Sequence, residues 1–368
     1  MKRLTTWIIA ALCCGATAAG ALQEDTELEW YGYFKLDMAR DSAVSSNGNY
    51  ILYVKPHEDD RAVSTLNMTA RQTRFGAKIK RESLNGVLEF DFYGSSPENK
   101  NALMLRKAYV VVPLGSLFLE AGQTSDLISP LVSSTINYSA GWGAGNVGYR
   151  RPQIKIYQRA GALYWGLSLA RNIGGDIDGD GIDDGEASGL PGIQGRVACS
   201  IDLGGSNLNV GTSAHYGRCD CPDENKSYAN WSINGDLSWV LSESVSLLGE
   251  VYRGVNMGQY GGAIYNKSQV GGVHSSGGWI NALYKPSVLW RFAVGGGADQ
   301  VDKNDLRGVE SARQRNAVIF ANGQRRIAAG LWAGFELSNW TTRYANVTPG
   351  TESEPTDWRL QWSLRGDF

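Results

Sequence analysis

Strict alternation of apolar and polar residues over the last eleven positions is the feature that most constrains the fold of this chain. From Trp358 to Phe368 the even positions are mostly large and apolar, and the odd positions read Arg359, Gln361, Ser363, Arg365, Asp367. Successive side chains of a strand point to opposite faces, so this pattern gives one apolar face and one polar face. It predicts a β-strand that separates an apolar medium from water.

The same alternation recurs along the chain. An early example has Trp30, Phe34 and Leu36 on one face, with Lys35 and Asp37 on the other. We predict about sixteen strands, near residues 28–41, 66–82, 86–97, 103–113, 116–124, 151–158, 161–172, 193–204, 206–217, 227–241, 245–255, 272–285, 287–302, 313–323, 326–342 and 356–368.

The connections between these strands alternate between short turns and long polar segments. The short turns are expected at 84–86, 113–115, 159–161, 204–205, 242–244, 285–287 and 323–325. One rim with turns and one rim with loops is typical of outer-membrane barrels. The chain is therefore predicted to be all-β: a closed transmembrane antiparallel β-barrel whose lumen is too wide for side chains to fill and so holds water.

The first residues have the order of a signal peptide. Lys2 and Arg3 precede an apolar stretch that is too short to span a bilayer as a helix, and small residues follow. We expect a signal peptide over 1–21, with cleavage after Ala21 or, alternatively, Ala18, and one barrel domain over 22–368. Without Lys2 and Arg3 the chain has 33 basic and 37 acidic residues, a balance of −4 that gives no indication of a nucleic-acid partner. The expected location is the outer membrane of a Gram-negative-type cell.

The segment 125–148, between the fifth and sixth expected strands, is long and rich in small and polar residues. We predict that it folds into the lumen and constricts the pore. The alternative is an outward loop at a contact between subunits.

Charged residues gather on the strands that flank this loop. We expect basic residues to face acidic ones across the lumen, because opposed charged walls create a field that orients polar solutes. The alternative is that the charges solvate the wall and pair with each other. The expected pore-lining residues are Arg74, Lys78, Glu89, Asp91, Arg106, Glu120, Arg151 and Lys155.

The stretch DIDGDGIDDGE resembles the first half of an oxygen-ligand calcium loop. Carboxylates stand at alternate positions, and a glycine allows a sharp turn. A full EF-hand would place Glu at the twelfth position, where this chain has Ala187. A structural Ca²⁺ in an extracellular loop is one interpretation, and a solvated acidic loop is the other. The candidate ligands are Asp176, Asp178, Asp180, the carbonyl of Ile182, and Asp184.

The cysteines and histidines give weaker indications. Cys199 is expected on the lipid face as a small apolar residue, whereas Cys219 and Cys221 could be free thiols, a short disulfide or metal ligands. Neither His215 nor His274 has a recognisable nucleophile arrangement, so no enzymatic activity is expected.

Several segments resemble the DcaP-like porins. They are RQTRFGAKIKRESLNGVLEFDFYG, LMLRKAYVVV, LEAGQTSDLISP and RPQIKIYQ, with GYFKLD and GFELSNW fitting the same pattern. The resemblance implies a sixteen-stranded homotrimeric channel that prefers small anionic organic solutes such as dicarboxylates. It also implies that Arg74, Arg106 and Arg151 line the constriction, while Arg71 shares its parity with Phe75.

These observations lead to the expectation of an outer-membrane porin. Its partners would be small anionic or polar solutes, outer-membrane lipid and lipopolysaccharide, and two further copies of the chain, without nucleic acid. The alternative function is a barrel scaffold for surface binding or adhesion, with a calcium-stabilised loop.

Overall fold

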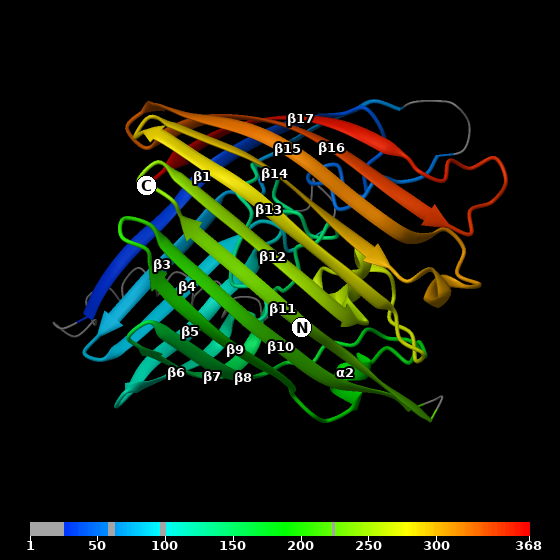
Figure 1. The fold of residues 1–368 in the computed structure, drawn as a ribbon, viewed down its shortest axis with the longest axis horizontal. Helices are drawn as coiled ribbons and strands as arrows, with labels where there is room; N and C mark the ends of the chain where they lie inside the picture. The colour runs from blue at the N-terminus through cyan, green and yellow to red at the C-terminus, as the bar shows by residue number, and fades with distance from the viewer. Residues whose placement is uncertain (1–25, 58–62, 96–100, 223–224) are drawn as a thin grey trace, which may run out of the picture.

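A computed structural model describes residues 26–57, 63–95, 101–222 and 225–368. The predicted signal peptide lies outside these residues. One antiparallel sheet closes on itself, because β1 (Thr26–Asp41) pairs with the last strand, β17 (Thr356–Asp367), as well as with β2 (Thr65–Thr69) and β3 (Arg74–Arg81). Figure 1 shows the resulting barrel with its tilted strands. The predicted all-β barrel is confirmed.

Consecutive strands pair around the rest of the barrel. They are β4 (Leu84–Asp91), β5 (Met104–Leu114), β6 (Leu117–Ser125), β7 (Arg150–Ala160), β8 (Leu163–Ala170), β9 (Gly192–Asp202), β10 (Asn207–Cys221), β11 (Lys226–Val240), β12 (Val245–Val255), β13 (His274–Ser287), β14 (Trp290–Val301), β15 (Ala312–Ala328) and β16 (Leu331–Ala345). Short helical segments occur in the long loops: α2 (Asp184–Ala187), η2 (Met257–Tyr260), η3 (Ala263–Tyr265) and η4 (Lys303–Leu306).

The strand predicted over 66–82 is two strands in the structure. A turn at 70–73, where the Thr73 amide donates to the Ala70 carbonyl at 2.9 Å, separates β2 from β3. The Thr73 hydroxyl then accepts a hydrogen bond from the Lys35 amide of β1 at 3.0 Å. Both short strands pair with β1, so they share one position in the barrel. Arg71 lies in this turn and is buried rather than sharing the outward face of Phe75.

Three of the predicted short turns are shifted along the chain. The turns lie between Arg81 and Leu84, between Ser287 and Trp290, and between Ala328 and Leu331, instead of at 84–86, 285–287 and 323–325. Gly323 is inside β15, where a Cβ atom would lie only 3.2 Å from the ring of Phe292. A glycine in a polar stretch indicated a turn, but here it makes room for a neighbouring aromatic ring.

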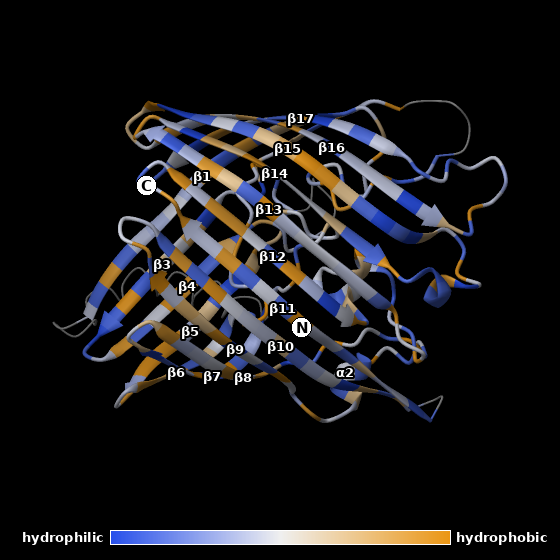
Figure 2. Ribbon diagram, in the orientation of Figure 1, coloured by the Kyte–Doolittle hydropathy of each residue, from blue (hydrophilic) through white to orange (hydrophobic). Residues whose placement is uncertain are grey.

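The outer face of the barrel is apolar and the inner face polar. Phe34, Leu36 and Ile233 are exposed, whereas the alternate residues Lys35 and Asp37 are buried inside. Figure 2 shows hydrophobic and hydrophilic residues alternating along the strands. No helix in the described part of the chain is long and apolar enough to cross a membrane.

The packed core lies inside the lumen at the long-loop end. The loop between β12 and β13 contributes Met257, Tyr260 and Ile264, which are almost fully buried with Ile128 of the loop between β6 and β7. A second cluster joins Ile51 of the first long loop to Val318 and Trp340 on the wall. Inward-folded loops therefore occupy much of the barrel, and they determine where the lumen stays open.

Candidate functional site

The loop over residues 126–149, between β6 and β7, crosses the lumen and is bonded to the opposite wall. Glu250 of β12 accepts hydrogen bonds from the Leu131 amide at 2.8 Å and the Ser129 hydroxyl at 2.6 Å. Glu336 of β16 accepts from the Ile136 amide at 2.5 Å. Both carboxylates are buried and so bind backbone donors out of bulk water. The predicted inward loop is confirmed, and the alternative of an outward loop is wrong.

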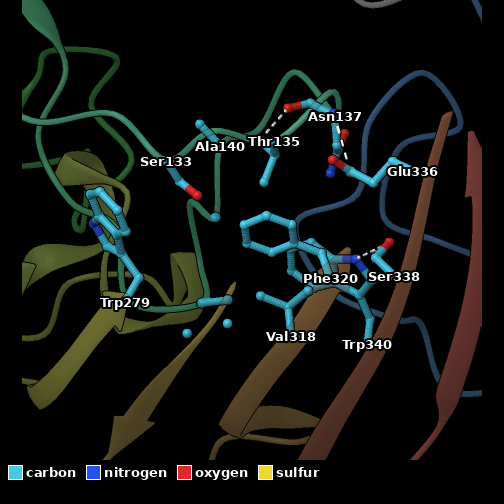
Figure 3. Close-up of a pocket in the computed structure, with 14 residues that line it drawn as sticks. Ser133, Thr135, Asn137, Ala140, Trp279, Val318, Phe320, Glu336, Ser338 and Trp340 are labelled. Carbon is cyan, nitrogen blue, oxygen red and sulfur yellow. Dashed lines mark hydrogen bonds between the residues drawn. The ribbon is translucent and has the colours of Figure 1, made fainter. Parts of the chain in front are cut away.

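Close packing adds to these hydrogen bonds. Figure 3 shows Thr135 and Ala140 of the loop above Phe320, Val318 and Trp340 of the wall. The cavity left between them is about 10 Å³, room for about one water molecule at most. The open part of the lumen therefore lies on the other side of the loop, between it and the strands near the start of the barrel.

On that open side Arg106 joins two carboxylates of β4. Its guanidinium lies 2.8 Å from Glu89 and 2.5 Å from Asp91, and Arg74 lies within 3.7 Å of Glu89. Tyr138 of the inward loop accepts a hydrogen bond from Arg106 at 3.2 Å. Burial raises the pKa of the Tyr138 hydroxyl, so this group is neutral beside the carboxylates. Arg74, Arg106 and Glu89 line one cavity beside the inward loop.

The acidic and basic residues do not form opposed walls, contrary to the expected transverse field. Glu89 and Asp91 lie on β4, between the strands that carry Arg74 and Arg106. Lys155 likewise pairs with Glu120 on the adjacent strand at 2.9 Å. Inward positions of neighbouring strands come within ion-pair distance because their backbones are hydrogen-bonded. The alternative that the charges pair with each other is therefore correct.

Two other expected pore residues lie elsewhere. Arg151 is 1% exposed, pairs with Asp126 at 2.8 Å and places its guanidinium 4.0 Å from the Tyr260 ring centroid. It is therefore a buried contact beneath the loops and does not line the open lumen. Lys78 is exposed beside Glu29, at 2.9 Å, near the short-turn rim.

The buried position of Arg151 gives a direct prediction. Arg151→Gln should lower the free energy of unfolding by about 3–5 kcal/mol, since it leaves the Asp126 carboxylate buried without its charge partner. Ion selectivity of folded protein should be unchanged. Denaturant unfolding in detergent measures the stability, and reversal potentials in a bilayer measure the ion selectivity. Adding Asp126→Asn to the variant should restore part of the stability. A selectivity change with unaltered stability would contradict this assignment.

Lys107 is a pore residue that the alternation did not identify. Glu89 pairs with Lys107 and Phe90 pairs with Leu105, so Arg106 is an extra residue in β5, a β-bulge. Beyond a bulge the parity of a strand inverts, because two residues oppose one. Arg106 and Lys107 therefore both point inward, and both line the same cavity. No signal in the sequence marks this bulge.

Basic residues predominate along the open lumen. A cavity of about 440 Å³ beside the inward loop is lined by Arg74, Arg106, Lys107, Arg150 and Arg365, with Glu89 as its one acidic lining residue among those described. A second cavity of about 280 Å³, nearer the short turns, is lined by Lys35, Lys285, Arg291 and Arg365, with no acidic lining residue in the described ranges.

Part of this positive charge is not compensated. Lys35 pairs with Asp37 and Arg365 with Asp367, whereas four lining residues form no ion pair within the described ranges. Two of these place their guanidinium over an aromatic ring, Arg150 on Tyr149 and Arg291 on Trp332. The four uncompensated residues are Lys107, Arg150, Lys285 and Arg291.

Aromatic side chains line the lumen towards the long loops. A cavity of about 330 Å³ there shares Tyr138, Trp142, Gly148 and Tyr149 with the basic cavity. Tyr138 stacks on Tyr93 with ring centroids 4.0 Å apart. The basic cavity shares lining residues with each of the other two, so the three cavities lie next to one another along the lumen.

The expected calcium ligands are divided into two clusters. Ligand atoms of Asp176, Asp178 and Asp180 lie within 4.8 Å of one another, and Ile182 is exposed. Asp184 belongs to a second cluster, in which its carboxylate lies within 4.8 Å of Asp178 and of the buried Cys221. Calcium binding to the first cluster stays a prediction.

The cysteines in the described residues form no disulfide. Cys199 is half-buried, and Cys219 and Cys221 are fully buried on one face of β10. His215 is buried against Ser232 at 2.8 Å and stacks on Tyr260, while His274 contacts Asp305 at 3.0 Å.

The fold is similar to that of solved outer-membrane channels. The crystal structure of the outer membrane channel DcaP of Acinetobacter baumannii matches with a TM-score of 0.78 at 17% identity, covering 94% of this chain and 98% of that one. An anion-selective porin from Comamonas acidovorans matches with a TM-score of 0.60 at 12% identity, covering 93% and 100%. A trimer form of OmpT from Vibrio cholerae matches with a TM-score of 0.55 at 9% identity, covering 94% and 100%.

No family model matches the sequence, and no curated protein matches it. The resemblance to DcaP-like porins is confirmed at the level of the fold, which is that of an outer-membrane porin. The apolar outer face of the barrel is suited to contact with membrane lipid.

Proposed function

We propose that this barrel is a passive diffusion channel for small polar solutes that favours small organic anions such as dicarboxylates. The observation that carries the proposal is the uncompensated positive charge of Lys107, Arg150, Lys285 and Arg291 along the lumen. In a narrow path with low-dielectric walls, charges of one sign raise the local concentration of the opposite ion. Exposed guanidinium groups also present paired donors to a carboxylate.

A homotrimer is part of the proposal. The similar OmpT structure is described as a trimer form. The barrel of this chain is closed by its own strands, so its lumen needs no residue from a partner. Each copy would therefore conduct independently.

Single-channel recording tests this function directly. Purified, heat-modifiable protein in a planar bilayer under a salt gradient should give steps in groups of three and a reversal potential of the sign for anions. Vesicle swelling should be faster with succinate than with succinamide, which has nearly the same size without charge. Silent protein would contradict a channel and favour the surface-binding scaffold, whereas cation preference would contradict the solute class.

A further inference from the structure

The loop between β8 and β9 packs a buried carboxylate against the β10–β11 hairpin. Asp184 begins α2 and is only 1% exposed. Its Oδ2 accepts hydrogen bonds from the Tyr228 hydroxyl at 2.7 Å and the Ile177 amide at 3.2 Å, and lies 3.6 Å from Cys221 Sγ. These donors are neutral, and all of them act on Oδ2.

The second oxygen of this carboxylate has no hydrogen-bond partner within the described ranges. An ionised carboxylate removed from water is costly unless a cation or several donors compensate it. The Asp184 carboxylate is therefore buried with Oδ1 unpartnered, while Oδ2 lies 3.6 Å from Cys221 Sγ and one of its oxygens lies within 4.8 Å of an Asp178 oxygen, a grouping that indicates a site for a cation.

The spacing of the surrounding atoms fits a small tetrahedral ion. One carboxylate oxygen each from Asp178 and Asp184 and the sulfur of Cys221 lie within 4.8 Å of one another. With bonds of about 2.3 Å to sulfur and about 2.0 Å to oxygen, tetrahedral angles place sulfur and oxygen roughly 3.5 Å apart. The separation between Cys221 Sγ and Asp184 Oδ2 is 3.6 Å, close to that value.

We propose that Asp178, Asp184 and Cys221 form a binding site for a divalent transition metal of the zinc type, with water as the fourth ligand. The thiolate decides between metals, because Ca²⁺ takes six to eight oxygen ligands whereas Zn²⁺ accepts sulfur. The site is distinct from the calcium site that the acidic repeat predicted, although the two clusters share Asp178. Its ligands come from two segments that are separate in sequence.

Metal binding here would fix the loop at 171–191 to the end of the β10–β11 hairpin. The loop is already ordered at its base, where the Asp183 carboxylate accepts hydrogen bonds from the Gly174 and Gly175 amides at 2.8 and 3.0 Å. A bound ion would add a cross-link from the next residue, Asp184, to Cys221 at the end of β10. Loop order at the long-loop rim would then depend on the metal.

Cobalt(II) titration of the folded, reduced barrel in detergent tests the site. One equivalent should produce the visible bands of tetrahedral cobalt and a near-ultraviolet band from thiolate to metal charge transfer. Zinc(II) should displace it and excess calcium should not. Cys221→Ser should remove the charge-transfer band, and Asp184→Asn should weaken binding roughly tenfold or more.

Matched controls use the same substitutions nearby. Cys199→Ser changes the half-buried cysteine of β9, and Asp220→Asn changes an acid that pairs with Arg218 at 3.0 Å instead of pointing into the cluster. Both should bind cobalt as the original chain does. Heat-modifiable mobility verifies folding of each variant. Three results would overturn the proposal: the original chain gives no spectrum of tetrahedral cobalt, folded Cys221→Ser gives an unchanged spectrum, or calcium displaces the cobalt.

Discussion

Replacing both Glu250 and Glu336 with glutamine should release the inward loop and widen the channel. Each carboxylate accepts two hydrogen bonds from the loop, from Ser129 and Leu131 and from Ile136 and Asn137, respectively. A glutamine side chain keeps one accepting oxygen but presents an NH₂ donor in place of the other, at a cost of about 2 kcal/mol per site, or about 4 kcal/mol together. That cost favours loop release by roughly a thousandfold.

Single-channel conductance checks this result, and we expect it to rise roughly twofold or more, with frequent fluctuations, as the constriction widens. Glu354→Gln is the control, because Glu354 is an exposed partner of Arg343 and does not touch the loop. Unchanged conductance in the folded double variant would show that packing alone, such as that around Phe320, fixes the loop.

Removing the charges of Lys107 and Arg150 should weaken anion selectivity. Both residues line the cavity beside the inward loop and form no ion pair with the described residues. A unit charge about 7 Å from a passing ion contributes about 0.6 kcal/mol in water, so two charges contribute about 1 kcal/mol after partial screening. The anion preference of Lys107→Gln/Arg150→Gln should therefore fall roughly fivefold.

Reversal potentials under a tenfold salt gradient at low ionic strength measure this effect. The paired control is Arg343→Gln, which removes a positive charge at an exposed ion pair with Glu354. Its selectivity should equal that of the original chain. If the double variant kept the original reversal potential, the uncompensated charges would not set selectivity, and Arg74 or the basic residues near the short turns would have to do so.

Alternation was sufficient to predict most of the barrel, because the match between a side chain's polarity and its surroundings is required at each residue separately. Each residue of a barrel strand faces either lipid or the lumen, and its polarity matches that environment. This is why Phe34 and Lys35 were assigned to the correct faces. The same parity predicted that Glu89 faces inward, and Glu89 lines the cavity beside the inward loop.

Local irregularities limited the prediction. The bulge at Arg106 turned Lys107 inward, and the turn after β2 buried Arg71, although neither feature has a distinctive sequence. A residue that differs by one in register changes face, so a single unrecognised bulge reverses the prediction for the rest of that strand.

The sequence by itself determined that this chain is a barrel with an apolar outside, a polar lumen and one long segment suited to constrict it. Tertiary structure decided which charges remain available to a solute. Ion pairs such as Lys155–Glu120 form between strands, and the cover over Arg151 comes from Tyr260 in a loop about a hundred residues away. Whether a charge is compensated depends on its distance to charges on other strands and loops, and the residue order along one strand does not give those distances.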